Sequence, residues 1–175
     1  MSADLNALLD ERAITRLLVD YCRACDRFDM PLLRSVYHPD AIEEHGMIDG
    51  RASGFCDFVE KAVGTGSPYK VTHHRLTNIA IDLHGDWAHV ESYFSAYHYR
   101  EDDSGRFDEF IGGRYVDRVE RRDGVWKIAH RKTVYDWSRI EPATQRFWEQ
   151  PQWLGGDQFV KGRRDRTDPV YGAVT

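Results

Sequence analysis

Four β-rich runs separated by short turn segments occupy the middle of the chain and constrain its fold most. The runs cover residues 69–83, 87–100, 107–121 and 125–137. The segments between them carry turn residues, and Asp123-Gly124 is the strongest hairpin signal among them. Short links of this kind join antiparallel neighbours, so the pattern predicts an antiparallel meander.

The part of the chain before these runs is predicted to be helical. The first helix carries an apolar stripe at helical spacing, made of Ile14, Leu17, Leu18, Tyr21, Cys22 and Cys25. A short helix over residues 30–37 ends at His38-Pro39-Asp40, and Ser53 is expected to cap a third helix over 54–63. Helices followed by antiparallel strands predict an α+β domain, in which the helices pack on one face of a strongly curved sheet.

The chain's 175 residues, 41% of them hydrophobic, suit a single core. We expect one domain over residues 1–139 and a C-terminal arm over 140–175. This arm carries several large apolar side chains whose exposure to water would be unfavourable: Phe147, Trp148, Trp153 and Phe159. The arm is therefore expected to pack on its own domain or on a neighbouring subunit of a homo-oligomer, either a trimer or a dimer.

Charge and targeting signals restrict the functional classes. The net charge is −5 and the pI is about 5.9. The charge therefore argues against nucleic acid as a partner, because binding to a phosphate backbone usually needs an excess of basic residues. The N-terminal sequence is charged and lacks the apolar run of a signal peptide or membrane span, which predicts a cytoplasmic protein with no membrane partner.

The three cysteines are expected to be small core residues in a reducing compartment. Cys22 and Cys25 share the stripe of the first helix, and Cys56 lies far from them in sequence. A redox or zinc role for this single C-x-x-C pair is a weaker alternative, because no second ligand pair accompanies it.

Asp26 is the most informative position for chemistry. It lies at the edge of the apolar stripe, near the C-terminus of the first helix. Burial and the helix macrodipole both disfavour a negative charge there, which favours a general base. The structural alternative is an aspartate that turns outward as a helix cap or surface residue.

The run that begins at residue 69 carries two adjacent histidines. Alternation places His74 with Asn78 on one face of the strand, and His73 with Arg75 on the other. Adjacent strand residues point apart, which argues against a metal site. An inward histidine is often a hydrogen-bonded core residue, but Asp26 offers it a carboxylate partner that would fix its tautomer.

Two further sets of residues are candidates for a site. Arg131, Thr133 and Tyr135 share a face of the last run. Arg131 is either an ion-pair partner, with Glu91 or Asp117 as the acid, or a group that binds an anionic leaving group. Alternating tyrosines on the second run form either an amphipathic sheet surface or a wall for aromatic ligands, and they are Tyr93, Tyr97 and Tyr99.

Several of these features together resemble a known family. Asp26 follows the first helix's stripe, His74 precedes Asn78 by four residues, and the sequence 120–127 leads into Arg131. In this respect residues 8–137 resemble the SnoaL-like branch of the nuclear transport factor 2-like superfamily. That branch includes scytalone dehydratase, bile acid dehydratase and hexachlorocyclohexane dehydrochlorinase.

The resemblance implies a cone-shaped fold with one deep apolar pocket and a lyase without metal or organic cofactor. Asp26 and His74 would form the base dyad, and Arg131 would assist the leaving group. Tyr21 stands where the dehydrochlorinase has a lysine, which disfavours a halide leaving group and suits a hydroxyl or carbonyl. The expected substrate-binding residues are Asn78, Tyr93, Tyr97 and Tyr135.

The expected substrate is a small aromatic or polycyclic compound. Dehydration of a cyclic or aryl alcohol is the leading reaction, and loss of formaldehyde from a lignin-derived diaryl propanediol is a close variant. Two alternatives remain: an isomerase like ketosteroid isomerase, and a protein without catalysis. The latter would be the small subunit of an aromatic-ring dioxygenase or a ligand-binding module.

Overall fold

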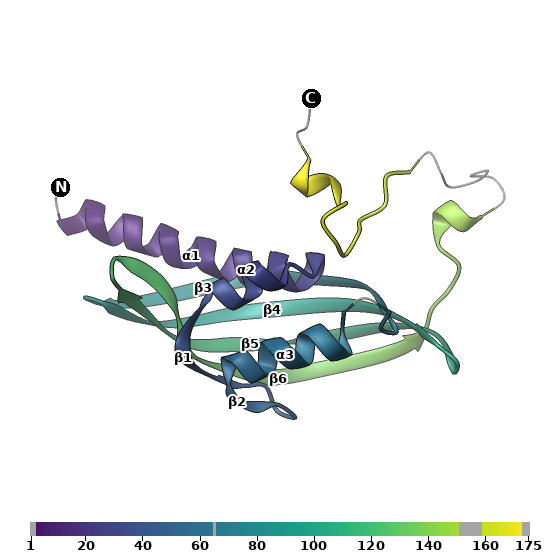
Figure 1. The fold of residues 1–175 in the computed structure, drawn as a ribbon, viewed down its shortest axis with the longest axis horizontal. Coiled ribbons are helices and arrows are strands. Elements are labelled where there is room, and N and C mark those ends of the chain that lie inside the picture. The colour runs from purple at the N-terminus through teal and green to yellow at the C-terminus, as the bar shows by residue number, and fades with distance from the viewer. Residues whose placement is uncertain (1–2, 65, 151–158, 173–175) are drawn as a thin grey trace.

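The computed structural model describes residues 3–64, 66–150 and 159–172 (Figure 1). Its elements, in chain order, are α1 Ala3–Arg27, α2 Met30–Ser35, β1 Tyr37–Glu44, β2 Asp49–Arg51, α3 Ala52–Ala62, β3 Tyr69–His84, β4 Trp87–Asp102, β5 Gly105–Arg122, β6 Val125–Pro142 and the short 3-10 helices η1 Phe147–Glu149 and η3 Pro169–Tyr171. In Figure 1, α1 and α2 lie along the β3 side of the sheet, and α3 crosses in front of β5 and β6.

The strands form one curved, open sheet in the order β2-β1-β6-β5-β4-β3. Strands β3 to β6 pair antiparallel in sequence order, which confirms the predicted meander. The α+β class, with helices packed against a curved sheet, is likewise confirmed. The sheet is mixed rather than purely antiparallel, because β1 joins β6 in parallel. This strand contains Pro39, where the sequence predicts the end of a helix.

Element ends differ from prediction in three places. The second helix ends at Ser35, and the third begins at Ala52, so Ser53 lies inside it and does not cap it. Strand β6 continues past residue 137 because Phe107 of β5 still pairs with Pro142. The strand therefore crosses the expected boundary at residue 139, and the division into domain and arm stays a prediction.

The core lies between α1 and the concave face of the sheet. The predicted stripe of α1 is buried, with Ile14 and Leu18 0% exposed. It packs with side chains from one end of the sheet, including Ala88, Val90 and Ile128. Burial of this face supplies the main stabilisation of α1, because helical propensity alone is weak.

An ion pair crosses the middle of the core. Arg131 donates through Nε and Nη2 to the carboxylate of Asp117, at 2.8 and 2.6 Å. The side chains of both residues are 0% exposed. The guanidinium also lies between two tyrosine rings, 4.1 Å from the centre of Tyr21 and 4.2 Å from that of Tyr115. Of the two partners expected for Arg131, the structure shows Asp117.

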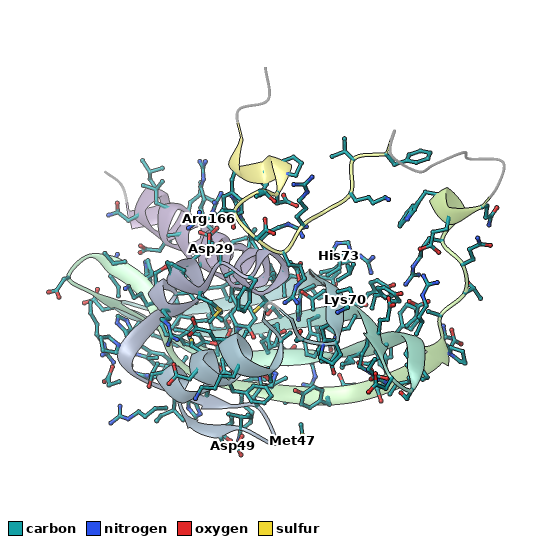
Figure 2. All side chains as sticks on the ribbon, turned by 45° about the vertical axis from the view of Figure 1, so that its right-hand side comes forward. Asp29, Met47, Asp49, Lys70, His73 and Arg166 are labelled. Carbon is teal, nitrogen blue, oxygen red and sulfur yellow. The ribbon has the colours of Figure 1, made fainter. Side chains whose placement is uncertain are left out.

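The C-terminal segment returns to the end of α1. Arg164 donates to the backbone carbonyls of Val63 and Tyr69, and Tyr171 donates to the carboxylate of Asp29. Arg166 also reaches Asp29 (Figure 2). These contacts join the segment to its own domain.

The expected C-terminal arm is described only in part, at residues 140–150 and 159–172. Trp153 lies outside the described residues. Within the described chain, no helix is both long and apolar enough to cross a membrane.

We predict that Arg131→Met lowers the free energy of unfolding by about 3–5 kcal/mol, because it leaves the Asp117 carboxylate buried without its partner. Denaturant titration followed by circular dichroism measures the loss. The control is the double variant Arg131→Met/Asp117→Leu, which removes both charges and should recover much of the stability. A single variant as stable as the wild type would contradict the prediction.

Candidate functional site

The carboxylate of Asp26 and the imidazole of His74 meet at the end of α1. Nδ1 of His74 lies 2.7 Å from Oδ1 of Asp26, and the backbone N–H of His74 donates to both carboxylate oxygens, at 3.1 and 2.9 Å. Asp26 is 6% exposed. A charged acceptor fixes the ring as the tautomer with hydrogen on Nδ1, so Nε2 is left to exchange a proton.

Two elements hold this pair together. Asp26 is in the last turn of α1, and Thr72 on β3 donates through its hydroxyl to the backbone carbonyl of Cys25, at 3.3 Å. Alternation along β3 then turns His74 inward, whereas His73 is exposed on the other face. The predicted choice between the two histidines agrees with this geometry.

His74 faces an open cavity of about 800 Å³ lined by α1, α3, the turn between β1 and β2, and the concave face of the sheet. This volume suits an organic molecule of one or a few rings. Most of the lining is apolar or aromatic, and it includes Tyr21, Phe55, Phe58, Tyr69, Phe94, Ile111, Tyr115 and Trp137. Met47, in the turn between β1 and β2, is 94% exposed and also borders the cavity (Figure 2).

The other two predicted catalytic residues, Tyr21 and Arg131, differ in whether they reach the cavity. Tyr21 lines the cavity, and burial raises the pKa of its hydroxyl well above the ordinary value, so it stays protonated as a potential donor. Arg131 lies behind Tyr21 and does not belong to the cavity lining. Its guanidinium faces Asp117, which makes it a support for the site's wall.

Of the four residues expected to bind substrate, only Tyr135 lines the cavity. Phe94, Ala96 and His98 of β4 point into the cavity, so alternation turns Tyr93 and Tyr97 to the opposite face. Tyr93 and Tyr97 therefore lie on the sheet face away from the cavity, as the sheet-surface alternative has it, and they do not form its wall.

Asn78 also lies away from the cavity. It has a φ of 48° at the irregularity where β3 shifts register between Thr77 and Ala80. The bulge breaks the strict alternation on which the prediction depended, and the side chain is exposed.

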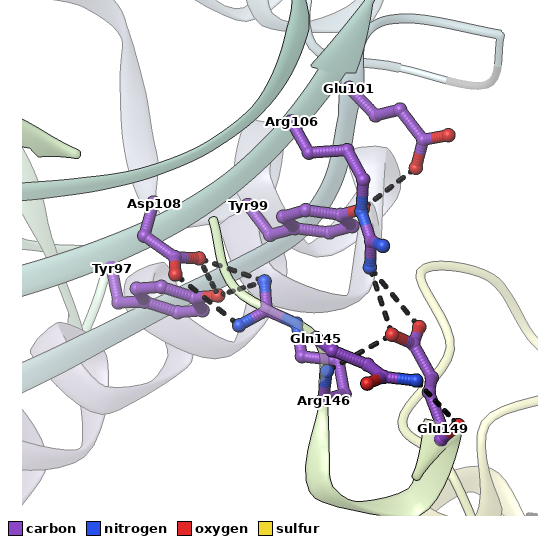
Figure 3. A network of polar contacts seen from close by, with 8 residues as sticks. All are labelled: Tyr97, Tyr99, Glu101, Arg106, Asp108, Gln145, Arg146 and Glu149. Carbon is purple, nitrogen blue, oxygen red and sulfur yellow. Dashed lines mark hydrogen bonds and ion pairs between the residues drawn. The ribbon is translucent and has the colours of Figure 1, made fainter. Parts of the chain in front are cut away.

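The tyrosines on the outer face anchor the chain that follows β6. Tyr97 donates to Asp108, and Arg146 donates to both the Tyr97 hydroxyl and the Asp108 carboxylate (Figure 3). Arg146 also lies over the ring of Tyr99, 4.4 Å from its centre. Burial and the adjacent Asp108 raise the pKa of Tyr97 to about 12. This network is structural.

His98 is a cavity residue that the sequence reading missed. Its ring centre lies 5.5 Å from that of His74, and its buried Nε2 has no hydrogen-bond partner among the described residues. Burial, followed by the nearby His74, lowers the pKa of His98 to about 3, so this imidazole is neutral at physiological pH. His74 pairs with Ala96 on the neighbouring strand, and His98 follows two residues later on the same face. Alternation along that strand could therefore have indicated that His98 faces the cavity.

Glu43 and His45 form a second carboxylate–imidazole pair, also missed. Nδ1 of His45 lies 2.9 Å from Oε1 of Glu43, and His45 lines the cavity. The signal was an acid and a histidine two residues apart, at the end of a strand and in the turn after it, but residues 37–44 were not predicted to be a strand.

Three buried cysteines are free thiols. Burial raises the pKa of Cys22 to about 12 and that of Cys56 to about 11, so both remain protonated. Within the described residues, no group of three or more His, Cys, Asp or Glu side chains is placed to hold a metal ion.

Solved structures share the fold of this chain. A scytalone dehydratase candidate from Novosphingobium aromaticivorans DSM 12444 is 25% identical, with a TM-score of 0.69 over 83% of this chain and 94% of that one. The hexachlorocyclohexane dehydrochlorinase of Novosphingobium barchaimii LL02 is 22% identical, with a TM-score of 0.69 over 82% of this chain and 98% of that one. Comparison with curated protein sequences gave no match.

The family follows from a sequence model. The model of the SnoaL-like domain matches residues 6–132, which is most of the chain and contains both Asp26 and His74. The structural neighbours are of the same fold and include dehydratase- and dehydrochlorinase-type proteins. The chain therefore belongs to the SnoaL-like family of the nuclear transport factor 2-like superfamily.

Proposed function

We propose that the protein is a cofactor-independent lyase that acts on a small aromatic or polycyclic substrate. The observation that carries this proposal is the Asp26–His74 pair, joined at 2.7 Å and open to a largely aromatic cavity. A carboxylate-oriented imidazole in an apolar cavity is suited to remove a proton from carbon or from a hydroxyl. The dehydratase- and dehydrochlorinase-type neighbours support elimination as the reaction class.

In the proposed reaction, Nε2 of His74 accepts the proton and the Asp26 carboxylate stabilises the resulting imidazolium. Asp26 already accepts hydrogen bonds from the ring and from the backbone, so the pair is oriented before substrate binds. Tyr21 is the hydroxyl on α1 that can donate to an oxygen of the substrate. Arg131 acts indirectly, because it holds the Tyr21 ring in place.

The cavity also favours a substrate with at least one ring. Phe94 and Tyr115 stack with their ring centres 4.5 Å apart, and Tyr135 meets Phe94 edge-on at 6.3 Å. Flat apolar walls of this kind bind aromatic rings through offset and edge contacts. Cyclic aryl alcohols and lignin-type diaryl propanediols are the compounds we propose to assay.

We predict that Asp26→Asn reduces turnover by about 10²–10⁴-fold, because the amide can hold the ring but cannot stabilise imidazolium. Mass spectrometry of products follows loss of water or formaldehyde, and circular dichroism checks folding. His74→Ala should be equally damaging, whereas the control His73→Ala should be near wild type. Wild-type turnover by Asp26→Asn, or a product of unchanged mass, would contradict the proposed lyase.

His98 gives a pH-dependent prediction. Its folded pKa of about 3 lies below the unfolded value near 6.5, so on acidification the unfolded chain takes up a proton that the folded chain resists. Stability from this residue therefore falls as pH drops from about 6.5 towards 3. His98→Gln should reduce the slope of unfolding free energy against pH in that window by up to one proton.

The matched control for this measurement is His73→Gln, since His73 is an exposed histidine of the same sheet. Urea titrations at a series of pH values give the slope for each protein. An unchanged slope in His98→Gln would show that His98 is protonated as easily in the folded chain as in the unfolded one.

We also propose that the chain alone assembles as a homo-oligomer. The end of β6 exposes two large apolar side chains, with Trp137 52% and Ile140 62% exposed. We predict that light scattering of the purified chain gives one defined mass above that of the monomer. Aggregation that is cured only by co-expression of a large iron-containing chain would instead indicate a dioxygenase small subunit.

A further inference from the structure

A second imidazole reaches the same cavity with its own carboxylate. Glu43 lies at the end of β1 with its side chain 0% exposed, and His45 follows in the turn to β2 with its side chain 26% exposed. The hydroxyl of Tyr37 donates to the other oxygen of Glu43, at 2.7 Å. Both carboxylate oxygens therefore have a hydrogen-bond partner, as a buried carboxyl group requires.

These contacts define which nitrogen of His45 is available. Nδ1–H has two acceptors within reach, the Glu43 carboxylate at 2.9 Å and the Thr133 hydroxyl oxygen at 3.1 Å. The ring also packs against Phe55, with centres 4.7 Å apart. Nε2 makes no hydrogen bond to any described residue, and the residue lines the cavity. This is the same arrangement as in His74, with the reactive nitrogen left for a ligand.

The Asp26–His74 and Glu43–His45 pairs lie near opposite edges of the sheet. His74 is on β3, one edge strand, whereas His45 follows β1, which lies on the far side of β6, β5 and β4. The cavity lies between them, because its lining contains both histidines and residues of β4, β5 and β6. A bound substrate can therefore contact one imidazole at each of two positions.

The Glu43–His45 pair is unlike the surface pairs of the protein. Glu44 and His130 also lie 2.6 Å apart, but their side chains are 34% and 44% exposed and neither lines the cavity. Such an exposed pair contributes little to stability or chemistry. A fully buried carboxylate that orients a cavity-facing imidazole is instead the usual arrangement of an acid–base group.

We propose that His45 is the catalytic acid of the lyase, which protonates the departing oxygen while His74 removes the proton from carbon, and that Glu43 is its positioning residue. The inference rests on the proposed function of the Asp26–His74 pair. It predicts a substrate whose leaving group is an oxygen, placed at the end of the cavity away from His74.

The electrons and protons balance within the cavity. Nε2 of His74 takes a proton from carbon, the electron pair of that C–H bond forms the new double bond, and the bond from the adjacent carbon to oxygen breaks. The oxygen leaves with the bonding pair and takes the proton from Nε2 of a protonated His45, so that water is released. Transfer of one proton from His74 to His45 through cavity water restores the starting state.

Ring opening of benzisoxazoles tests the two roles separately without the natural substrate. A base removes the ring C–H proton, the N–O bond breaks, and a cyanophenolate leaves, which absorbance follows directly. The 5-nitro compound has a good leaving oxygen, whereas unsubstituted benzisoxazole has a poor one and depends more on an acid. The proteins compared are the wild type, Asp26→Asn, His45→Gln, Glu43→Gln and the surface control His130→Gln.

We expect Asp26→Asn to slow both compounds by similar factors. His45→Gln should slow the unsubstituted compound about tenfold more than the nitro compound, a difference that general acid catalysis of 10²–10⁴-fold easily covers. Glu43→Gln should change the ratio in the same direction, and His130→Gln should change neither rate. Thermal melting confirms that each variant is folded.

Each other outcome has a definite meaning. Equal slowing of both compounds by His45→Gln, or slowing no greater than that of His130→Gln, overturns the acid role while leaving the base dyad intact. Unchanged rates in Asp26→Asn overturn the proposed base, and with it the inference. If the wild type opens the ring no faster than buffer alone, both the proposed base and the proposed acid are overturned.

Discussion

The position of the Asp26–His74 pair depends on the contacts that the guanidinium of Arg131 makes in the core. It joins β6 to Asp117 of β5 by two hydrogen bonds and to Tyr21 of α1 by ring stacking. Three elements are thereby held in one register in the core, because a buried charge tolerates little loss of its partner. Asp26 lies further along the same helix, so the register that Arg131 fixes also brings Asp26 to His74 on β3.

The sheet divides into zones that explain where the cavity forms. At one end, Ala88, Val90 and Ile128 are completely buried under α1. At the middle, Phe94 and the residues level with it line the cavity. The zones exist because α1, with 25 residues, spans about 37 Å, whereas β4, with 16 residues, spans about 53 Å. The helix ends before the sheet does, and Asp26 marks that end.

Sequence reasoning found the Asp26–His74 pair because two local rules place it: helical spacing puts Asp26 beside an apolar stripe, and alternation turns His74 opposite to His73. The predictions from sequence failed where contacts between segments distant in the chain determine which residues meet. The parallel pairing of β1 with β6 is invisible in short-range patterns, so Glu43 and His45 were missed. Tyr97 was assigned to the wrong face because aromatic content says nothing about which side of a strand is covered.

The cavity gives three histidines three different surroundings. His74 and His45 each have a carboxylate on Nδ1, whereas His98 has none and is kept neutral by burial. A neutral imidazole such as that of His98, beside His74 in the cavity, can hydrogen-bond a substrate oxygen without competing for its proton. In the proposed mechanism the same residue type would serve as base, acid and neutral partner, because the backbone elements that carry each ring also determine whether a carboxylate lies behind it.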